Sequence, residues 1–387
     1  MFGYRMPTRV HIEPGSVARL PEAARSLGLP RVLLVVDRGL RETPWVETVQ
    51  DLLTGTGIEH ETFDAVEPNP RTTTVSALAE QLRGDGAAGV VALGGGSVLD
   101  AAKAAAMLSQ NEFRIEQYEG KNRYAEPPLP MVAIPTTCGT GSEVTWVSVL
   151  SHPTTRSKIS IKGESMFPDQ ALVDADLIGS LPASMVAWTG LDALTHAIEA
   201  TVCTAANPVS DALAEKAIAL LLRYLPRAAE NVSGDDVARE AVMRASTLAG
   251  LAFSNADVAA VHCLSESLGG LYDHPHGLLN AMLLLPTLRY HQRFIVDRLA
   301  DLDGLLSGDD AVGAPGAEAN ADERAEHFLG VLESLGRRLE VPAFSTLSVP
   351  TDDYGTIADH AMMNGSNRSN PQPMAAHNYV EILGALD

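Results

Sequence analysis

Four residues whose side chains bind transition metals lie in two apolar stretches of the second half of the chain. Asp192 and His196 are four residues apart in TGLDALTHAIEA, so on a helix both side chains leave one face about 6 Å apart. His262 lies in VAAVHCLSESLGGLYDHPHG, and His276 follows the Gly-Gly pair of that stretch, where we expect a turn to bring it back toward the others. One carboxylate and three imidazoles form a ligand set typical of iron or zinc, with positions left open for a substrate.

Each of these residues alone would be interpreted as a packed or capping side chain, because a single histidine on a helical face is usually structural. The joint occurrence of Asp-x-x-x-His and two further histidines in separate apolar helices favours a shared metal ion.

A second group of residues suits phosphate groups. In GVVALGGGSVLDAAKAAAM a strand pattern ends in Gly94, Gly95, Gly96 and Ser97, and a helical pattern follows. Glycines let backbone N–H groups approach a pyrophosphate, and the helix N-terminus adds partial positive charge. The segment lacks the Gly-x-Gly-x-x-Gly fingerprint, so a tight strand-to-helix turn without a ligand explains it equally well when it is taken alone.

Two other strand ends strengthen the nucleotide interpretation. The segment PTTCGTGS (135–142) supplies hydroxyls and glycines beside the first loop if the two strands are neighbours. Asp37 ends RVLLVVD and places a carboxylate where the ribose of an adenosine would lie. Such a carboxylate accepts from a free 2′-hydroxyl and repels a 2′-phosphate, which favours NAD over NADP; the alternative is an N-cap or turn aspartate.

The elements that position these residues change character near the middle of the chain. Near-continuous apolar strands are predicted at 31–37, 89–97 and 130–137, and they alternate with helices as in a parallel sheet covered on both faces. From about Ala183 onward, apolar spacing predicts helices over 185–202, 210–225, 236–253 and 280–294.

We therefore expect two domains, 1–178 and 179–387, since a chain of 387 residues exceeds one compact core of the usual size. The stretch 307–326 is rich in Gly, Ala and Asp and predicts a mobile surface insertion between helices.

Composition excludes several functions. A formal net charge of −21 repels phosphate backbones and anionic membranes, so we expect neither as a partner. The sequence shows no apolar run of about 18 residues and no signal-peptide pattern, which predicts a cytoplasmic protein without a membrane anchor. Cys138, Cys203 and Cys263 lie far apart, which argues against a disulfide framework and against a cysteine zinc site.

The chain resembles the iron-containing (group III) alcohol dehydrogenases over almost its whole length. The resemblance is carried by PTRVHIEPGSVARL, VVDRGL, VEPNP, GGGSVLDAAK, PTTCGTGSEVT, TGLDALTHAIEA, LGGLYDHPHG and NPQP. It implies an α/β plus all-α protein of the dehydroquinate synthase-like fold, with a Rossmann-like NAD-binding domain, an all-helical metal-binding domain and an active site between them. The implied activity is NAD-linked interconversion of a small primary alcohol or diol and its aldehyde.

The family's functional residues carry over onto matching positions. The resemblance implies that Asp192, His196, His262 and His276 bind Fe(II), with Zn possible. It places in the cofactor-contact motifs Asp37, Asn69, Gly95, Gly96, Ser97, Asp100, Thr136, Thr137, Ser142 and Lys158. Lys158 matches a lysine near the nicotinamide ribose, although an exposed strand lysine is the alternative. Asp100 could instead be a first-turn acid that complements the helix dipole.

Two positions depart from the family pattern. Glu266 stands one helical turn after His262, where the family usually has a histidine that is suspected of proton handling. A glutamate there could relay a proton, approach the metal as an oxygen ligand, bind a basic group of the substrate, or be a solvated cleft carboxylate. His274 replaces a small apolar residue and could line the substrate pocket.

Three alternatives to the dehydrogenase are a metal-independent, maleylacetate-reductase-like enzyme, a dehydroquinate-synthase-like lyase and a non-catalytic module. The complete Asp and His set speaks against the first and the third. The scarcity of Lys and Arg near the ligand motifs speaks against the lyase, whose substrate is phosphorylated. Family members are commonly dimers or larger, so we expect a homo-oligomer.

Overall fold

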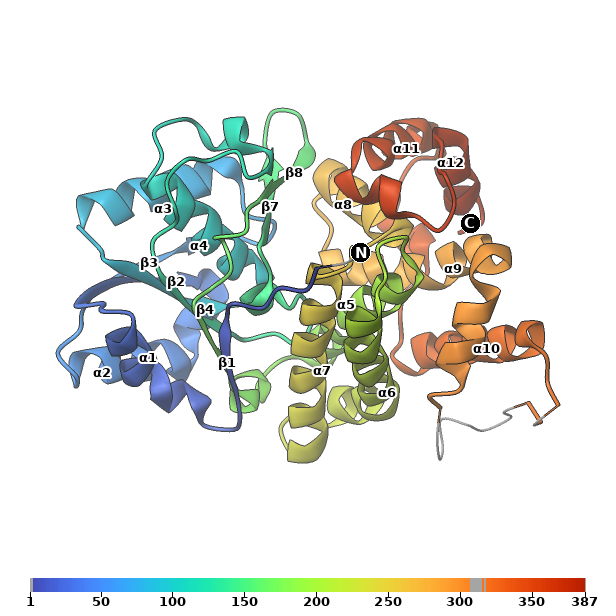
Figure 1. The fold of residues 1–387 in the computed structure, drawn as a ribbon, viewed down its shortest axis with the longest axis horizontal. Helices are drawn as coiled ribbons and strands as arrows, with labels where there is room; N and C mark the ends of the chain where they lie inside the picture. Colours follow the sequence, from blue (N-terminus) through green and yellow to red (C-terminus); the bar gives the residue numbers. More distant parts are fainter. Residues whose placement is uncertain (1–2, 307–314, 317, 387) are drawn as a thin grey trace. The chain divides into compact units, whose positions relative to one another are not determined.

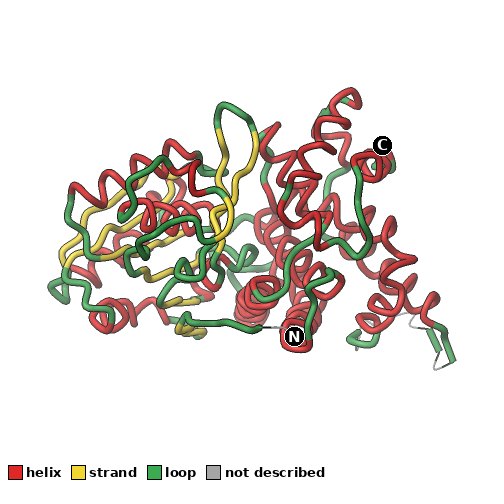
Figure 2. The backbone as a smooth tube through the Cα atoms, turned by 45° about the horizontal axis from the view of Figure 1, so that its top comes forward, coloured by secondary structure: helices red, strands yellow, loops and turns green. Residues whose placement is uncertain are grey.

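The computed structural model describes residues 3–386 apart from 307–314 and 317. The chain forms two compact units, Arg5–Ser180 and Leu181–Asp387, and the second also includes the residues up to Tyr4. Within the described residues, strands occur only in the first unit, and the second is built of helices (Figures 1 and 2). The predicted fold class, an α/β unit followed by an all-helical unit, is confirmed.

The first unit is built around a six-stranded parallel sheet. In spatial order its strands are β1 (Arg9–Ile12), β9 (Gln170–Val173), β6 (Met131–Pro135), β4 (Gly89–Gly94), β2 (Arg31–Asp37) and β3 (Glu59–Val66). The three predicted strands are therefore β2, β4 and β6, which lie side by side in the sheet. The strand predicted over 89–97 ends earlier, at Gly94, because a helix begins at Gly96. The chain reverses its progress across the sheet between β2 and β4, and open α/β sheets bind ligands at such a point.

Helices cover both faces of this sheet. One face packs against α1 (Leu20–Ser26) and α2 (Pro44–Thr54), and the other against α3 (Thr72–Gly84) and α4 (Gly96–Ser109). In β2, Leu34 contributes to the first core and Leu33 to the second. Successive strand side chains alternate between faces, so a strand buried on both sides is a continuous apolar run.

A smaller sheet is formed by one strand that precedes β6 in the chain and two strands that follow it. Its strands are, in spatial order, β5 (Gly120–Lys121), β8 (Ser157–Lys162) and β7 (Val147–His152), and β7 and β8 form an antiparallel hairpin. Short 3-10 helices in this unit are at Ser16–Arg19, Arg38–Glu42, Ile115–Tyr118, Ser142–Val144 and Ala175–Ile178.

The second unit is organised around one buried helix, α5 (Ala183–Val202), which packs against three others. Every residue of α5 from Gly190 to Val202 is buried. The other helices are α6 (Pro208–Glu230), α7 (Asp236–Ser254), α8 (Ala260–Tyr272), α9 (His276–Asp303), α10 (Ala321–Arg338), α11 (Tyr354–Met363) and α12 (Ala376–Gly384), with short 3-10 helices at Phe344–Leu347, Thr351–Asp353 and Gly365–Ser369. The predicted helices correspond to α5, α6, α7 and α9.

Two local predictions need correction. The Gly-Gly pair Gly269-Gly270 does not break the chain but lies inside α8, and the turn comes at Asp273, whose φ is 60°, followed by Pro275. Gly disfavours a helix by only about 1 kcal/mol, which packing of α8 offsets.

In the predicted insertion, residues 307–314 and 317 lie outside the described residues, and residues 321–326 are helical. Asn320 and Glu323 form a capping box that starts α10.

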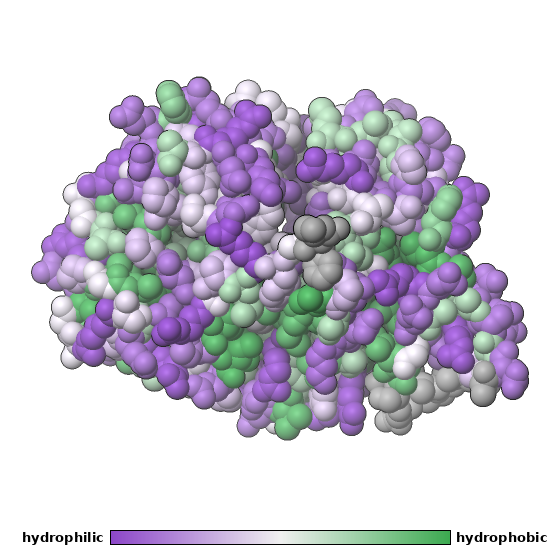
Figure 3. All heavy atoms as spheres, viewed as in Figure 1, coloured by the Kyte–Doolittle hydropathy of each residue, from purple (hydrophilic) through white to green (hydrophobic). Residues whose placement is uncertain are grey.

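On the face drawn in Figure 3, hydrophilic side chains predominate and apolar ones form small patches, in keeping with the net charge of −21. None of the described helices combines the length and the apolar character needed to span a membrane.

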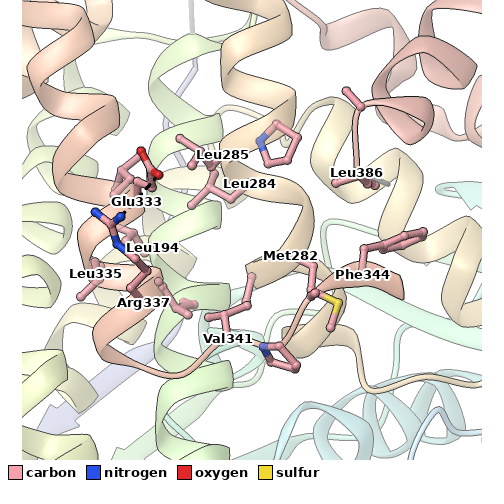
Figure 4. Close-up of a pocket in the computed structure, with 18 residues that line it drawn as sticks. Leu194, Met282, Leu284, Leu285, Glu333, Leu335, Arg337, Val341, Phe344 and Leu386 are labelled. Carbon is pink, nitrogen blue, oxygen red and sulfur yellow. Dashed lines mark ion pairs between the residues drawn. The ribbon is translucent and has the colours of Figure 1, made fainter. Parts of the chain in front are cut away.

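A cavity of about 330 Å³ lies within the second unit. Apolar side chains of α5, α9 and α10 line it, together with the segment 341–344 and the end of the chain (Figure 4). Glu333 and Arg337 form an ion pair of 3.7 Å at this cavity. None of the four predicted metal ligands lines it, so it is separate from the predicted site.

His291 of α9 makes the stability of the protein depend on pH. Burial lowers the pKa of His291 to about 4, and the charge of Glu199 only partly opposes this. The unfolded chain, with an ordinary histidine pKa of about 6.5, therefore binds more protons than the folded chain between these values. Stability from the neutral histidine is complete above about pH 6.5 and is lost as the pH falls toward 4.

The free energy of unfolding of the wild type should fall as the pH is lowered from 6.5 to 4. We predict that His291→Asn makes this fall smaller by up to about 3 kcal/mol. Asn can still accept the hydrogen bond that Gln372 Nε2 donates to His291 Nδ1 over 3.3 Å. Urea unfolding of both proteins, followed by circular dichroism at several pH values, measures the difference. An unchanged slope in the variant would contradict the assignment.

Candidate functional site

The four predicted metal ligands converge in the helical unit. One ligand atom from each of Asp192, His196, His262 and His276 lies within 4.8 Å of the others. Oδ1 of Asp192 is 3.8 Å from Nδ1 of His196, 4.0 Å from Nε2 of His262 and 3.7 Å from Nε2 of His276. The first three residues are buried and His276 is half-buried. These four residues are called the metal cluster below.

Three helices supply the metal cluster. The i, i+4 spacing places Asp192 and His196 on one face of α5, as predicted, while His262 lies in the first turn of α8 and His276 is the first residue of α9. The close approach of α9 to α5 depends on Gly277. A Cβ there would lie 2.7 Å from the carbonyl oxygen of Trp188, a distance that real structures essentially never show.

Glu199 fixes the orientation of His262. It lies on α5, seven residues after Asp192 and therefore on the same helical face. Its Oε2 is 2.6 Å from Nδ1 of His262, and its carboxylate also accepts from the backbone N–H groups of Ala259 and Val261 over 2.9 and 2.8 Å. The buried carboxylate thus caps the start of α8 and holds an imidazole of the metal cluster.

The contact with Glu199 also sets the tautomer of His262. Because a carboxylate accepts, the proton of the neutral ring lies on Nδ1, and the lone pair of Nε2 points into the metal cluster. Burial lowers the pKa of His262, but the hydrogen bond and charge of Glu199, together with the charges of Asp192 and Glu266, raise it overall. A metal-binding histidine that donates its other N–H to a carboxylate is a recurrent arrangement in proteins.

Of two further predicted residues, Glu266 lies in the middle of α8 and His274 lies just after its end. Oε2 of Glu266 accepts a hydrogen bond from Asn364 Nδ2 over 2.8 Å, and Asn364 follows the end of α11. His274 lies in the turn between α8 and α9 and stacks on Tyr272, with ring centroids 6.1 Å apart. Both side chains are half-buried.

In the first unit, the predicted nucleotide loops lie at the carboxyl edge of the sheet. The loops after β4 and β6 are neighbours, since the N–H of Thr136 donates to the carbonyl of Gly94 over 3.0 Å. Ser97 lies in the first turn of α4. The condition that these two strands are neighbours is therefore met.

Two of the glycines lie where the two loops contact each other. A Cβ on Gly95 would lie 3.0 Å from the side chain of Thr137, and one on Gly96 would lie 2.5 Å from that of Thr140. A larger residue at Gly96 would require the side chain of Thr140 to move. Both loops therefore approach each other closely at the helix N-terminus, where an anion is stabilised.

Asp100 joins α4 to the second loop. Its Oδ1 accepts from the hydroxyl of Ser142 over 2.5 Å, and its Oδ2 accepts from the N–H of Val149 over 2.8 Å. Both oxygens are thus used within the protein, and Asp100 positions the predicted cofactor residue Ser142.

Lys103, one turn further along α4, is a buried cation beneath these loops. Its Nζ lies 3.2 Å from Oδ1 of Asp100 and donates to the carbonyl of Ser142 and the hydroxyl of Thr145, both over 3.1 Å, and to the carbonyl of Val147. Burial lowers the pKa of this lysine, and the charge of Asp100 opposes the shift.

Three other predicted residues lie near this edge. Nζ of Lys158 donates to Oδ1 of Asn69 over 2.7 Å and to the hydroxyl of Ser151 over 3.0 Å, so two predicted cofactor residues contact each other. Asn69 has a φ of 54°. Oδ1 of Asp37 accepts from the N–H of Leu40 over 3.0 Å, so Asp37 caps the 3-10 helix Arg38–Glu42 that follows β2. Contact of these residues with a cofactor stays a prediction.

Two family models match nearly the whole chain. Residues 7–175 match the iron-containing alcohol dehydrogenase model, and residues 186–386 match the model of the C-terminal part of the Fe-containing alcohol dehydrogenase family. The chain belongs to the iron-containing alcohol dehydrogenase family. It is therefore an oxidoreductase, an alcohol dehydrogenase, and the lyase and the non-catalytic module are set aside.

Characterised relatives of this alcohol dehydrogenase match it from end to end. It is 36% identical over 375 residues to the 1,3-propanediol dehydrogenase of Klebsiella pneumoniae, covering 96% of this chain and 95% of that protein. It is 32% identical over 385 residues to the NAD-dependent methanol dehydrogenase of Bacillus methanolicus, covering 99% of each. The solved structure of a 1,3-propanediol oxidoreductase superposes with a TM-score of 0.95 at 34% identity, covering 100% of both chains.

The sequence did not single out Glu199 or Lys103. Glu199 carries a detectable signal, since it repeats on the face of Asp192 and His196 within an otherwise apolar helix. Lys103 carries a weaker one, a lone lysine in the alanine-rich segment that becomes α4.

We predict that Glu199→Gln weakens metal binding by the dehydrogenase about 10- to 100-fold. The variant keeps the size of the side chain but removes the charge that holds the Nδ1 proton of His262. Equilibrium competition with a chelating dye measures the affinity. Glu230→Gln, which removes a 62% exposed carboxylate of the same unit, serves as the control and should leave affinity unchanged. Equal affinity in the wild type and Glu199→Gln would show that the carboxylate only caps α8.

We also predict that Lys103→Met lowers the free energy of unfolding by about 3 kcal/mol, since it leaves Asp100 without its cationic partner. The same variant should weaken NADH binding, because the loop from Ser142 to Val147 loses its anchor. Circular dichroism during urea unfolding and NADH fluorescence titration measure the two effects. In the control Lys121→Met, an exposed lysine over the ring of Trp146 is removed, and we expect a change of at most about 1 kcal/mol.

Proposed function

We propose that this alcohol dehydrogenase transfers hydride between NAD(H) and a small primary alcohol or diol, with its aldehyde as the other partner, at one divalent ion. Fe(II) is the first candidate for the ion and Zn the second. The observation that carries the proposal is the convergence of one carboxylate oxygen and three imidazole nitrogens within 4.8 Å, from three different helices.

The donor set fits such an ion. Borderline metals such as Fe(II) and Zn(II) prefer imidazole nitrogen with a carboxylate oxygen, and four protein ligands leave positions for a substrate oxygen. Glu199 directs the Nε2 lone pair of His262 into the metal cluster, as a metal ligand requires. We therefore assign Asp192, His196, His262 and His276 as the ligands. The ion, when bound, supplies Lewis-acid polarisation of the alcohol or aldehyde oxygen.

The first unit supplies the cofactor site of the proposal. NAD accepts or donates the hydride when bound. The backbone of Gly95 to Ser97 and the hydroxyls of Thr136, Thr137 and Ser142 would bind its phosphates, at the point where the sheet order reverses. Asp37, at the end of β2, would accept from the ribose hydroxyls and exclude a 2′-phosphate. Asp100 holds Ser142 in place.

Three residues are proposed to act nearest the reacting groups. Lys158, held by Asn69 and Ser151, would donate to the nicotinamide ribose. Glu266 would relay the proton released from the alcohol, and Asn364 keeps one of its oxygens in place. His274 would border the substrate. We propose a cytoplasmic location, since Cys138, Cys203 and Cys263 are all buried and none of them forms a disulfide. The family resemblance alone supports the proposed homo-oligomer.

The metal dependence is tested by NADH oxidation with a panel of short aldehydes. Protein stripped with a chelator should be inactive, and anaerobic addition of Fe(II) or Zn(II) should restore turnover. His262→Ala should lose bound metal and activity together, whereas His377→Ala, at an exposed position of the same unit, should retain both. Full turnover by metal-free protein would contradict the proposal and favour the metal-independent, maleylacetate-reductase-like reductase.

A further inference from the structure

The side chain of Asn280 lies inside the metal cluster. Asn280 is fully buried on α9, one turn after His276. Its amide nitrogen Nδ2 is 2.6 Å from Oδ1 of Asp192 and 3.1 Å from Nε2 of both His262 and His276. The nitrogen thus contacts three of the four atoms that are proposed to hold the ion.

These contacts are hydrogen bonds that the amide donates. The carboxylate of Asp192 accepts, and Nε2 of His262 presents a lone pair because Glu199 takes the proton on Nδ1. An amide NH₂ has two hydrogens, and here it faces three acceptors. Within the described residues, no donor reaches Oδ1 of Asn280, so the interactions of this side chain are made by its nitrogen.

A hydrogen-bond donor and a metal ion interact with the same lone pairs of these side chains, so they cannot occupy them at the same time. We propose that Asn280 competes with the metal ion for Asp192, His262 and His276, and thereby lowers metal affinity and keeps the ion exchangeable. This inference rests on the proposed function of the metal cluster. Asn280 thus has a positioning role. Its amide holds three of the proposed ligands together in the ion-free protein, and these hydrogen bonds must break before an ion can bind.

The competition has an energetic consequence with a definite sign. A buried carboxylate and inward-facing imidazole lone pairs are costly without donors, so the amide stabilises the ion-free protein. The ion-bound protein does not have these hydrogen bonds. Loss of the amide therefore destabilises only the ion-free form, and metal binding becomes tighter.

The experiment compares the full-length wild type with two variants, Asn280→Ala and Asn280→Asp. Zn(II) affinity is measured by competition with a chelating dye, and the melting temperature is measured in chelator and with saturating Zn(II). Asn280→Ala should bind Zn(II) about tenfold more tightly, since a hydrogen bond to a charged group is lost from the ion-free form alone. Its melting temperature should fall in chelator but not with Zn(II).

The variant Asn280→Asp is included because, in Asn280→Ala, a water molecule could fill the space and replace the lost hydrogen-bond donor. It keeps the shape of the side chain but replaces the donor with a second carboxylate facing Asp192. Its melting temperature in chelator should fall further than that of Asn280→Ala, and its Zn(II) affinity should exceed that of Asn280→Ala.

Asn370→Ala is the matched control. Asn370 is also a buried asparagine of the second unit, and it hydrogen-bonds to Asn367 and Tyr379 instead of to the metal cluster. This variant should lower the melting temperature equally with and without Zn(II), and its affinity should match the wild type.

Weaker Zn(II) binding in Asn280→Ala, or a change of less than threefold in both Asn280 variants, would overturn the inference and show that the amide supports or merely neighbours the ion. Failure of the wild type to bind Zn(II) or Fe(II) at all would instead refute the proposed metal site. The two failures are therefore distinguishable.

Discussion

The hydrogen bond between Glu199 and His262 is the contact on which the metal cluster depends. It joins the central helix of the second unit to the N-terminus of α8, and the same carboxylate accepts two backbone N–H groups there. The start of α8 and the direction of the His262 ring are thus fixed together. Since Asp192 and His196 lie on the same face of α5, one helix positions two of the proposed ligands directly and a third through Glu199. Small residues complete the arrangement, because Gly277 lets α9 bring His276 within reach.

Buried charge also holds the predicted nucleotide loops of the first unit, but here the charged group is a cation. Here a buried cation, Lys103, is shared between the carboxylate of Asp100 and backbone carbonyls of the second loop. A lysine with good acceptors on several sides can remain buried, and its loss would leave those acceptors without a donor. The contacts of Asp100 and Lys103 therefore give two loops, which have little secondary structure of their own, a defined position beside the N-terminus of α4.

The sequence predicted those features that depend on local periodicity. The central strands, the helices α5 to α7 and α9, and the pairing of Asp192 with His196 all follow from spacing alone. The edge strand β3 escaped notice because its residues are largely polar. The contact of Glu199 with His262 could not be predicted, because it depends on α8, which begins at Ala260. The burial of Lys103 could not be predicted either, because it depends on how a distant loop folds over it. The Gly-Gly pair misled because packing of α8 outweighs the low helix propensity of glycine.

The departure at Glu266 bears on the choice of substrate. Three carboxylates lie at or next to the proposed ligands. Asp192 is one of these ligands, Glu199 contacts His262, and Glu266 stands one helical turn after His262. Imidazoles that bind an ion are neutral. If a divalent ion is bound there as proposed, three negative charges would face its two positive charges. A carboxylate-bearing substrate would be repelled from such a site, whereas a neutral alcohol, diol or aldehyde would not. Such a charge balance would disfavour the dicarboxylate of a maleylacetate-type reductase. Glu266 contributes to it at a position where the family usually has a histidine.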